Sequence, residues 1–173
     1  YNRYRIDTDY DGTEGESVET AKAREAVIQV KDLYKIYRMG DTKVHALDGV
    51  DFEIYRGEFC AITGPSGSGK STLLNMIAGI LSLDAGEILI NGEDITKKHQ
   101  REKDKFRIKN IGYIFQDFKL ITEMSVMDNI NIIKLEGVDT SGADSVLDML
   151  GIKEKKNKKE KYLSGGEKQR VAI

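Results

Sequence analysis

The residues GPSGSGKST at positions 64–72 have the types and spacing of a phosphate-binding loop. They satisfy the pattern G-x-x-x-x-G-K-[ST], in which glycines let backbone N–H groups turn inward around an anion because no Cβ obstructs the approach. We expect Lys70 to reach the β- and γ-phosphates of a nucleotide and the Ser71 hydroxyl to hold Mg²⁺. The predicted loop contacts are Gly64, Pro65, Ser66, Gly67, Ser68, Gly69, Lys70, Ser71 and Thr72.

The segments on either side of this loop predict the elements that position it. Residues 58–63 are a short apolar run typical of a buried strand, and residues 70–81 carry apolar side chains at helical spacing. A helix that begins at Lys70 points its positive end toward the same anion. Strand, loop and helix together predict a P-loop nucleotide-binding protein, a class that includes kinases, GTPases and motors.

A second motif, LSGGEKQR, occupies residues 163–170. Ser164, Gly165 and Gly166 precede a segment able to form a helix, so their hydroxyl and N–H groups are expected at a helix N-terminus, where anions bind. Taken alone, such a segment is also a common N-cap. It gains significance because it follows the phosphate loop by about ninety residues on the same chain.

The two motifs together resemble those of the ATP-binding cassette (ABC) transporter family, and the resemblance extends over residues 27–173. In that family two cassettes face head to tail, and the signature motif of one clamps the γ-phosphate held by the loop of the other. The resemblance therefore implies that Ser164, Gly165 and Gly166 bind ATP in trans. It further implies ATP and Mg²⁺ as cofactors and a second ABC ATPase domain, in a homodimer, as partner.

Two residues outside these motifs also match the family. Tyr37, in YKIYRMG, matches the aromatic residue that stacks on adenine; Tyr34 is the alternative, and ordinary packing in a β layer is another interpretation of Tyr37. Gln116, which closes IGYIFQ, matches the Q-loop glutamine and is implied to contact Mg²⁺ and the attacking water. Residues 117–124 are implied to couple to a membrane partner.

The resemblance assigns no catalytic residue within this sequence. The family's catalytic glutamate and switch histidine follow the signature motif, and no residue between 1 and 173 matches either of them. We therefore expect a full-length protein to be an ATPase, whereas residues 1–173 bind ATP without turnover.

Composition narrows the possible partners. The sequence has 173 residues, 32% of them charged, with a net charge of −2, so no bulk attraction to nucleic acid is expected. The longest apolar stretch, 73–81, is far shorter than the roughly 20 residues of a membrane span, so no direct membrane insertion is expected. Residues 1–25 are polar and acidic, and we expect a flexible lead-in there.

The predicted fold is α/β, with a P-loop NTPase sheet core, an antiparallel β subdomain and an inserted helical subdomain that carries the signature motif. The β-rich runs between 26 and 55 predict the antiparallel layer, and residues 111–115 predict another buried strand. Residues 26–173 are expected to form the N-terminal part of one ABC nucleotide-binding domain, with the helical subdomain at about 120–173 and the C-terminal part absent.

The finer resemblance is to the family's lipoprotein-release and macrolide-export branch. It implies an ATP-binding subunit of a transporter that drives a transmembrane permease, in lipoprotein, peptide or drug export. Such a subunit is cytoplasmic and lies on the inner face of the cell membrane through its permease. Two alternatives stay open: a non-transport ABC protein that acts on DNA or ribosomes, and a nucleotide-sensing switch in envelope function or cell division.

Overall fold

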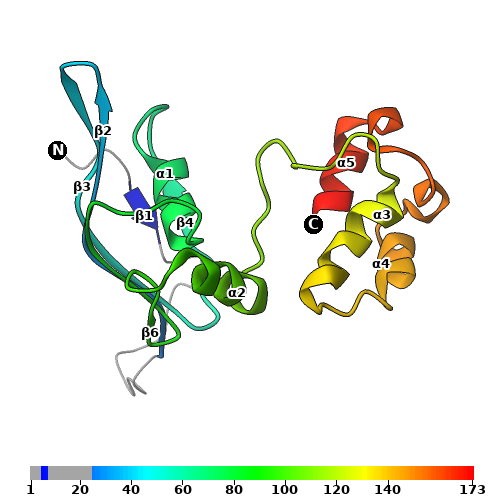
Figure 1. The fold of residues 1–173 in the computed structure, drawn as a ribbon, viewed down its shortest axis with the longest axis horizontal. Helices are drawn as coiled ribbons and strands as arrows, with labels where there is room; N and C mark the ends of the chain where they lie inside the picture. Colours follow the sequence, from blue (N-terminus) through cyan, green and yellow to red (C-terminus); the bar gives the residue numbers. More distant parts are fainter. Residues whose placement is uncertain (1–4, 8–24) are drawn as a thin grey trace, which may run out of the picture. The chain divides into compact units, whose positions relative to one another are not determined.

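The computed structural model describes residues 5–7 and 25–173, and the chain divides into two compact units between Ile111 and Gly112 (Figure 1). The first unit contains an antiparallel sheet, the phosphate loop and two helices. The second unit consists of short helices joined by turns. Within the described residues, no helix combines the length and the apolar character that a membrane-spanning helix requires.

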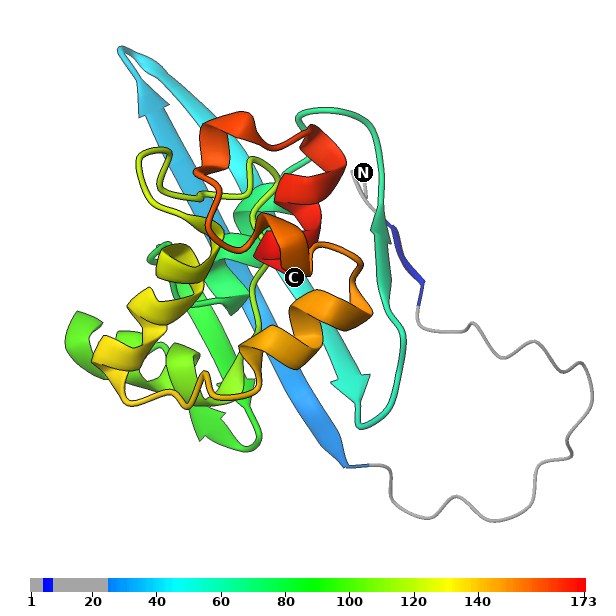
Figure 2. The same cartoon turned by 90° about the vertical axis from the view of Figure 1, so that its right-hand side faces the viewer.

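A four-stranded antiparallel sheet of order β3-β2-β5-β6 dominates the first unit. Strands β2 (Ala26–Met39) and β3 (Thr42–Tyr55) form a long hairpin that turns at Gly40, where φ is 59° (Figure 2). Strand β5 (Ala85–Ile90) pairs with the other edge of β2, and β6 (Glu93–Asp94) pairs with β5. The antiparallel layer predicted from the β-rich runs is confirmed.

Strand β4 (Ala61–Thr63) leads into the phosphate loop and pairs antiparallel with β1 (Arg5–Asp7). The residues of β1 lie within the segment 1–25 that was expected to be a flexible lead-in, so the structure differs from that expectation at these three positions. A short strand edge accepts any extended backbone, because its N–H and C=O groups bond without regard to side-chain type. Glu25, the last residue of this segment, forms an ion pair of 2.9 Å with Arg56. The other residues of the expected lead-in, 1–4 and 8–24, lie outside the described residues.

Two helices complete the first unit: α1 (Lys70–Ile77) and α2 (Gln100–Asn110). Helix α1 presents Leu73, Met76 and Ile77 to the core at helical spacing, whereas the sequence predicted a helix extending to residue 81. The chain leaves the helical conformation at Gly79, where φ is 67°. The main core cluster comprises Val30, Leu33, Leu47, Val50, Leu73, Met76, Ile77, Ile88, Ile90, Ile95 and Phe106.

The second unit contains three α-helices, α3 (Val126–Asn131), α4 (Ala143–Met149) and α5 (Gly165–Ala172). Three 3-10 turns connect them: η1 (Ile132–Glu136), η2 (Lys153–Lys155) and η3 (Glu160–Tyr162). Its own core consists of Val126, Leu147, Ile152 and Leu163.

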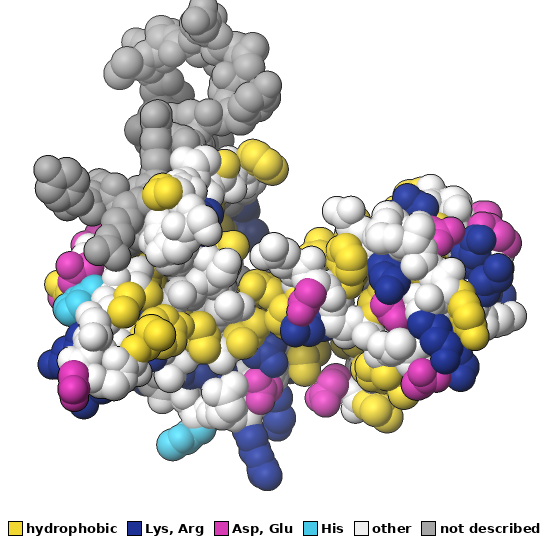
Figure 3. Space-filling model, turned by 90° about the horizontal axis from the view of Figure 1, so that it is seen from above, with side chains coloured by type: hydrophobic (Ala, Val, Ile, Leu, Met, Phe, Trp, Pro, Cys, Tyr) yellow, Lys and Arg dark blue, Asp and Glu magenta, His cyan; other side chains and the backbone are white. Residues whose placement is uncertain are grey.

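Apolar side chains also reach the surface of each unit (Figure 3). In the second unit, Leu135 and Met149 are each 86% exposed. In the first unit, Phe59 is 76% exposed.

The prediction of a buried strand at residues 111–115 is wrong. After α2 the backbone runs on without ladder hydrogen bonds, and the rings of Tyr113 and Phe115 pack edge to face with centroids 4.8 Å apart. The half-buried and exposed side chains do alternate as in a strand. A strand also requires a neighbouring backbone to bond with, and no described segment pairs with these residues.

Candidate nucleotide-binding site

The phosphate loop leaves β4 after Thr63 and enters α1 at Lys70, in the order strand, loop, helix that the sequence predicted. The strand expected at residues 58–63 covers only Ala61–Thr63, and its side chains are not buried. Three of its glycines have positive φ: 149° at Gly64, 78° at Gly67 and 99° at Gly69. Gly69 is also the N-cap of α1, and a Cβ there would lie 2.3 Å from the carbonyl oxygen of Ala46 on β3. Glycine is therefore required at Gly69 both for the backbone conformation and for packing against the sheet.

The Lys70 side chain folds back over the loop. Its Nζ donates to the carbonyl oxygens of Gly64 (2.9 Å) and Pro65 (2.8 Å) and lies 3.4 Å from the hydroxyl oxygen of Ser68. Ser68 itself is only 3% exposed. These contacts hold a positive charge beside the N-terminus of an eight-residue helix with no acidic residue in its first turn. Such a combination of ammonium group, backbone N–H groups and helix dipole is suited to binding a phosphate.

The residues after Lys70 fit a nucleotide-linked magnesium ion. Ser71 lies in the first turn of α1 and is exposed, and Thr72 follows it. A hydroxyl is a hard oxygen ligand, and Mg²⁺ commonly takes few protein ligands and completes its shell with substrate phosphates and water. Among residues 5–7 and 25–173, no group of three or more His, Cys, Asp or Glu side chains is placed to hold a metal ion. A single exposed hydroxyl, such as that of Ser71, suits an ion that arrives bound to a nucleotide.

Of the two candidate aromatic residues on β2, Tyr37 is the more accessible. It pairs with Val44 on β3, is 38% exposed, and has the Lys35 Nζ 5.7 Å from its ring centroid. Tyr34 is half-buried, and its hydroxyl lies so close to Gly49 that a Cβ there would be 2.9 Å away. The neighbouring Asp32 carboxylate raises the pKa of Tyr34 by charge repulsion and by hydrogen bonding. Tyr37 is thus the more exposed of the two rings.

The signature residues form the N-terminus of α5, which begins at Gly165. Ser164 is its N-cap: the Ser164 hydroxyl oxygen accepts the N–H of Glu167 at 3.3 Å, and the Ser164 N–H donates to the Glu167 carboxylate at 2.7 Å. These hydrogen bonds lower the pKa of Glu167, the backbone bond most strongly. Gly165 and Gly166 are exposed, so this helix terminus is accessible to an anion.

Gln116 lies in the second unit, in the turn that follows Phe115, and its side chain is exposed. The next residues include two consecutive left-handed positions without glycine, Phe118 (φ 59°) and Lys119 (φ 51°). Asp117 and Lys119 form an ion pair of 2.6 Å across this turn. The structure therefore places the phosphate loop and Tyr37 in the first unit, and Gln116 and the signature residues in the second.

Sequence reasoning missed two residues close to Tyr37. Lys35 precedes Tyr37 by two positions, and the period of a strand places both side chains on the same face, so the sequence held a signal for Lys35. Asp84 is at hydrogen-bond distance from both the Lys35 amine and the backbone of Ile36. No sequence pattern pointed to Asp84, because its bonds to Lys35 and Ile36 depend on how β5 pairs with β2.

The fold and the loop define the class of protein: a P-loop nucleotide-binding protein with an antiparallel β layer and a separate helical unit. The ABC transporter family model matches residues 47–173, and the chain belongs to that family.

Several relatives and solved structures agree with this assignment. The chain is 36% identical over 152 residues to an uncharacterized ABC transporter ATP-binding protein of Thermotoga maritima, covering 85% of this chain and 65% of the relative. It is 41% identical over 135 residues to the lipoprotein-releasing system ATP-binding protein LolD of Bacteroides fragilis, covering 75% of this chain and 62% of that protein. The chain thus spans less than two thirds of the length of these relatives.

The macrolide export ATP-binding/permease protein MacB of Bdellovibrio bacteriovorus is 40% identical over 151 residues, which are 85% of this chain and 23% of that protein. Among solved structures, the ATP-binding cassette MJ0796, in a dimeric post-hydrolysis state bound to ADP and Pi, matches with a TM-score of 0.74 and 34% identity. That match covers 84% of this chain and 66% of the cassette.

Proposed function

We propose that the chain is the ATP-binding part of an ABC transporter subunit, which binds MgATP between two cassettes and, in the complete protein, hydrolyses it to drive a transmembrane permease. The observation that carries this proposal is the Lys70 amine, held by loop oxygens at the start of α1. The names of relatives such as LolD and MacB support it. These two names favour a lipoprotein or a macrolide drug as the cargo, and our proposal also includes peptide export.

Each residue of the site has a role in this proposal. The loop N–H groups and Lys70 bind the β- and γ-phosphates, and Ser71 holds Mg²⁺, with Gln116 as a further ligand. Magnesium supplies neutralisation of charge on the phosphates when it is bound. Tyr37 stacks on the adenine ring. Positioning and charge stabilisation are the main contributions that a protein makes to phosphoryl transfer, and these residues provide both.

The second half of each site comes from another copy of the cassette. In our proposal the exposed α5 terminus, with Ser164, Gly165 and Gly166, contacts the γ-phosphate bound to the partner's loop. Two dimeric structures of the MJ0796 cassette, at TM-scores of 0.74 and 0.75, support a homodimer. The permease would hold this dimer at the cytoplasmic face of the membrane. Residues 1–173 contain no match to a catalytic glutamate, so we expect them to bind ATP without turnover.

MgATP affinity tests the proposal directly. We expect Lys70→Met to weaken binding about 10- to 100-fold, because the variant loses charged hydrogen bonds to phosphate. Lys43→Met is the matched control, since Lys43 is an exposed lysine of the same unit, on the β3 side of the hairpin turn. Isothermal titration calorimetry would measure both variants. Equal affinity of Lys70→Met and the wild type would contradict the proposed function.

A further inference from the structure

Tyr37 is supported by two charged residues that the family assignment does not explain. The geometry points to Lys35 as a positioning residue that fixes the Tyr37 ring for stacking on the nucleotide base, with Asp84 holding Lys35 in place. This inference rests on the proposed function, in which Tyr37 carries the base. It adds a determinant of base recognition that is separate from the phosphate loop.

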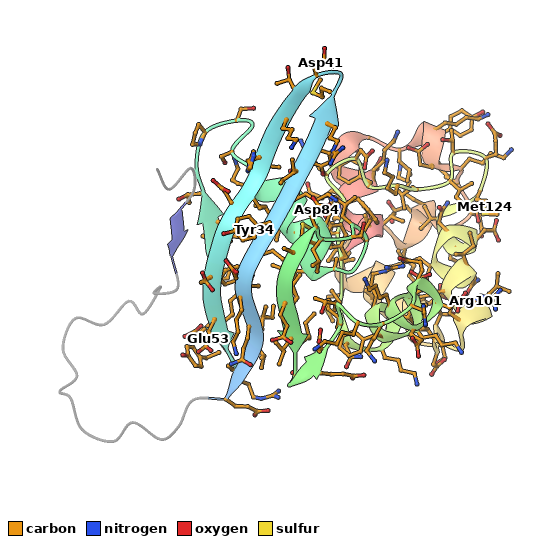
Figure 4. The ribbon with its side chains drawn as sticks, turned by 60° about the vertical axis from the view of Figure 1, so that its left-hand side comes forward. Tyr34, Asp41, Glu53, Asp84, Arg101 and Met124 are labelled. Atoms are coloured by element: carbon orange, nitrogen blue, oxygen red, sulfur yellow. The ribbon has the colours of Figure 1, made fainter. Side chains whose placement is uncertain are left out.

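Asp84 bonds to the backbone of β2 immediately before Tyr37. Its carboxylate accepts the N–H of Ile36 at 2.6 Å, and its own N–H donates to the carbonyl oxygen of Tyr34 at 3.0 Å. The β2–β3 register shifts between Lys35 and Ile36, so the carboxylate bonds to the backbone at an irregularity of the ladder. Figure 4 shows Asp84 beside this part of the sheet, where β5 begins.

Lys35 connects Asp84 to the aromatic ring. Its Nζ lies 3.5 Å from the Asp84 carboxylate and 5.7 Å from the centroid of Tyr37, within the range of a cation–π contact. The Lys35 side chain is only 13% exposed, whereas that of Asp84 is 42% exposed, so the lysine is the more enclosed partner of this ion pair. With the ammonium group over one face of the ring, a base would stack on the opposite face.

The charge of Asp84 persists at neutral pH. The hydrogen bond from Ile36 lowers the pKa of Asp84, against the opposing effect of burial, and the positive charges of Lys35 and Arg38 lower it further. An ionised carboxylate attracts the Lys35 ammonium group and limits its movement. Lys35 in turn limits the orientations of the Tyr37 ring, because a displaced ring loses the cation–π contact.

In this arrangement, the residues that bind the base are separate from those that bind the phosphates. Lys70 and the loop glycines contact phosphates, whereas Lys35 acts only through Tyr37. A variant that frees the ring should weaken ATP binding and leave the binding of inorganic tripolyphosphate unchanged. A general loss of folding stability would weaken the binding of both ligands alike. A change in the ratio of the ATP affinity to the tripolyphosphate affinity therefore reports on the ring.

The experiment measures MgATP and magnesium tripolyphosphate affinity of the full-length protein by calorimetry. We expect Lys35→Gln and Asp84→Ala each to weaken MgATP binding about three- to tenfold, with tripolyphosphate affinity unchanged. Lys35→Arg should retain the preference for ATP, because a guanidinium group also stacks on aromatic rings. Lys31→Gln, at an exposed lysine of the same strand, is the matched control.

Tyr37→Ala distinguishes a failure of the stacking role of Tyr37 from a failure of the positioning role of Lys35. If Tyr37→Ala removes the preference for ATP while Lys35→Gln and Asp84→Ala keep it, the positioning role is wrong and the proposed function stands. If Tyr37→Ala also keeps the preference, the base does not stack on Tyr37 and both the stacking role and this inference are wrong. If Lys35→Gln weakened the binding of both ligands equally, the role of Lys35 would be structural only, and the inference would be overturned.

Discussion

Gly69 links the chemistry of the loop to the stability of the fold. Its φ of 99° disfavours any residue with a Cβ, and a Cβ would also overlap the Ala46 carbonyl oxygen at 2.3 Å. Gly67 shares the first constraint, with φ at 78°, but a Cβ there would meet nothing within 4 Å. A comparison of alanine substitutions at the two glycines therefore separates the cost of backbone strain from the cost of steric overlap with the sheet.

We predict that Gly69→Ala lowers the free energy of unfolding by about 2–4 kcal/mol, since the backbone must move to relieve the overlap. Gly67→Ala should cost about 1 kcal/mol, because only its conformation is strained. Urea unfolding of both variants measures the difference. A similar loss in the two would show that the contact with Ala46 does not constrain the loop.

Glu167 gives the N-terminus of α5 a dependence on pH. Hydrogen bonds from Ser164 lower its pKa below the ordinary value of 4.5. A carboxylate with a lowered pKa contributes stability above its unfolded-state pKa, and the contribution is lost as the pH falls through the folded-state value. We predict that the wild type is more stable than Glu167→Gln at pH 7, and that this difference shrinks as the pH falls below the ordinary value of 4.5 and is lost below the lowered pKa of the folded state. Denaturant unfolding at several pH values tests this, and a difference that persists at low pH would contradict it.

At the scale of single elements, the core of the second unit holds the signature motif in position. Leu163 is 7% exposed and packs in one cluster with Val126, Leu147 and Ile152, and the next residue is the N-cap Ser164. The start of α5 is thus anchored by the apolar residue just before it. Loosening this core should disturb the signature terminus without any change in the signature residues.

Neighbouring residues of α4 provide a matched test. Leu147 is 2% exposed, whereas Val146 is 51% exposed. We predict that Leu147→Ala lowers the free energy of unfolding by about 2–5 kcal/mol, because it removes buried methyl groups and leaves a cavity. Val146→Ala should cost less than about 1 kcal/mol, since its side chain remains largely in water. Thermal or urea unfolding compares the two, and equal losses would mean that Leu147 is not part of a packed core.

Local patterns predicted those elements whose hydrogen bonds are also local. The spacing of Leu73 and Ile77 predicted α1, and the Ser164–Glu167 spacing is that of a capped helix start. The strand expected at residues 111–115 did not form because no described segment pairs with these residues, and the availability of a partner cannot be read from the residues themselves. Asp84 was missed for the same reason, since its bonds to β2 arise only when β5 pairs there. These particular contacts between distant segments therefore could not be predicted from the local sequence.

At the scale of the whole molecule, the phosphate loop belongs to one unit and the α5 terminus to the other, and this makes the proposed dimer testable. In the proposed function, the loop residues 64–72 bind nucleotide within one copy. The α5 terminus, residues 164–166, contacts only the nucleotide bound to a second copy. Protection of the two segments should therefore respond differently to protein concentration.

We predict that a slowly hydrolysed ATP analogue with Mg²⁺ protects backbone amides of the loop from hydrogen exchange at every protein concentration at which the site is filled. Protection at the α5 terminus should increase with protein concentration, because it requires the dimer. Ser164→Arg should abolish the second effect and leave the first, since the larger side chain blocks the terminus but not the loop. Ser145→Arg is the control, because Ser145 is an exposed residue of α4. Concentration-independent protection of the α5 terminus would place both contacts within one copy and exclude the trans arrangement.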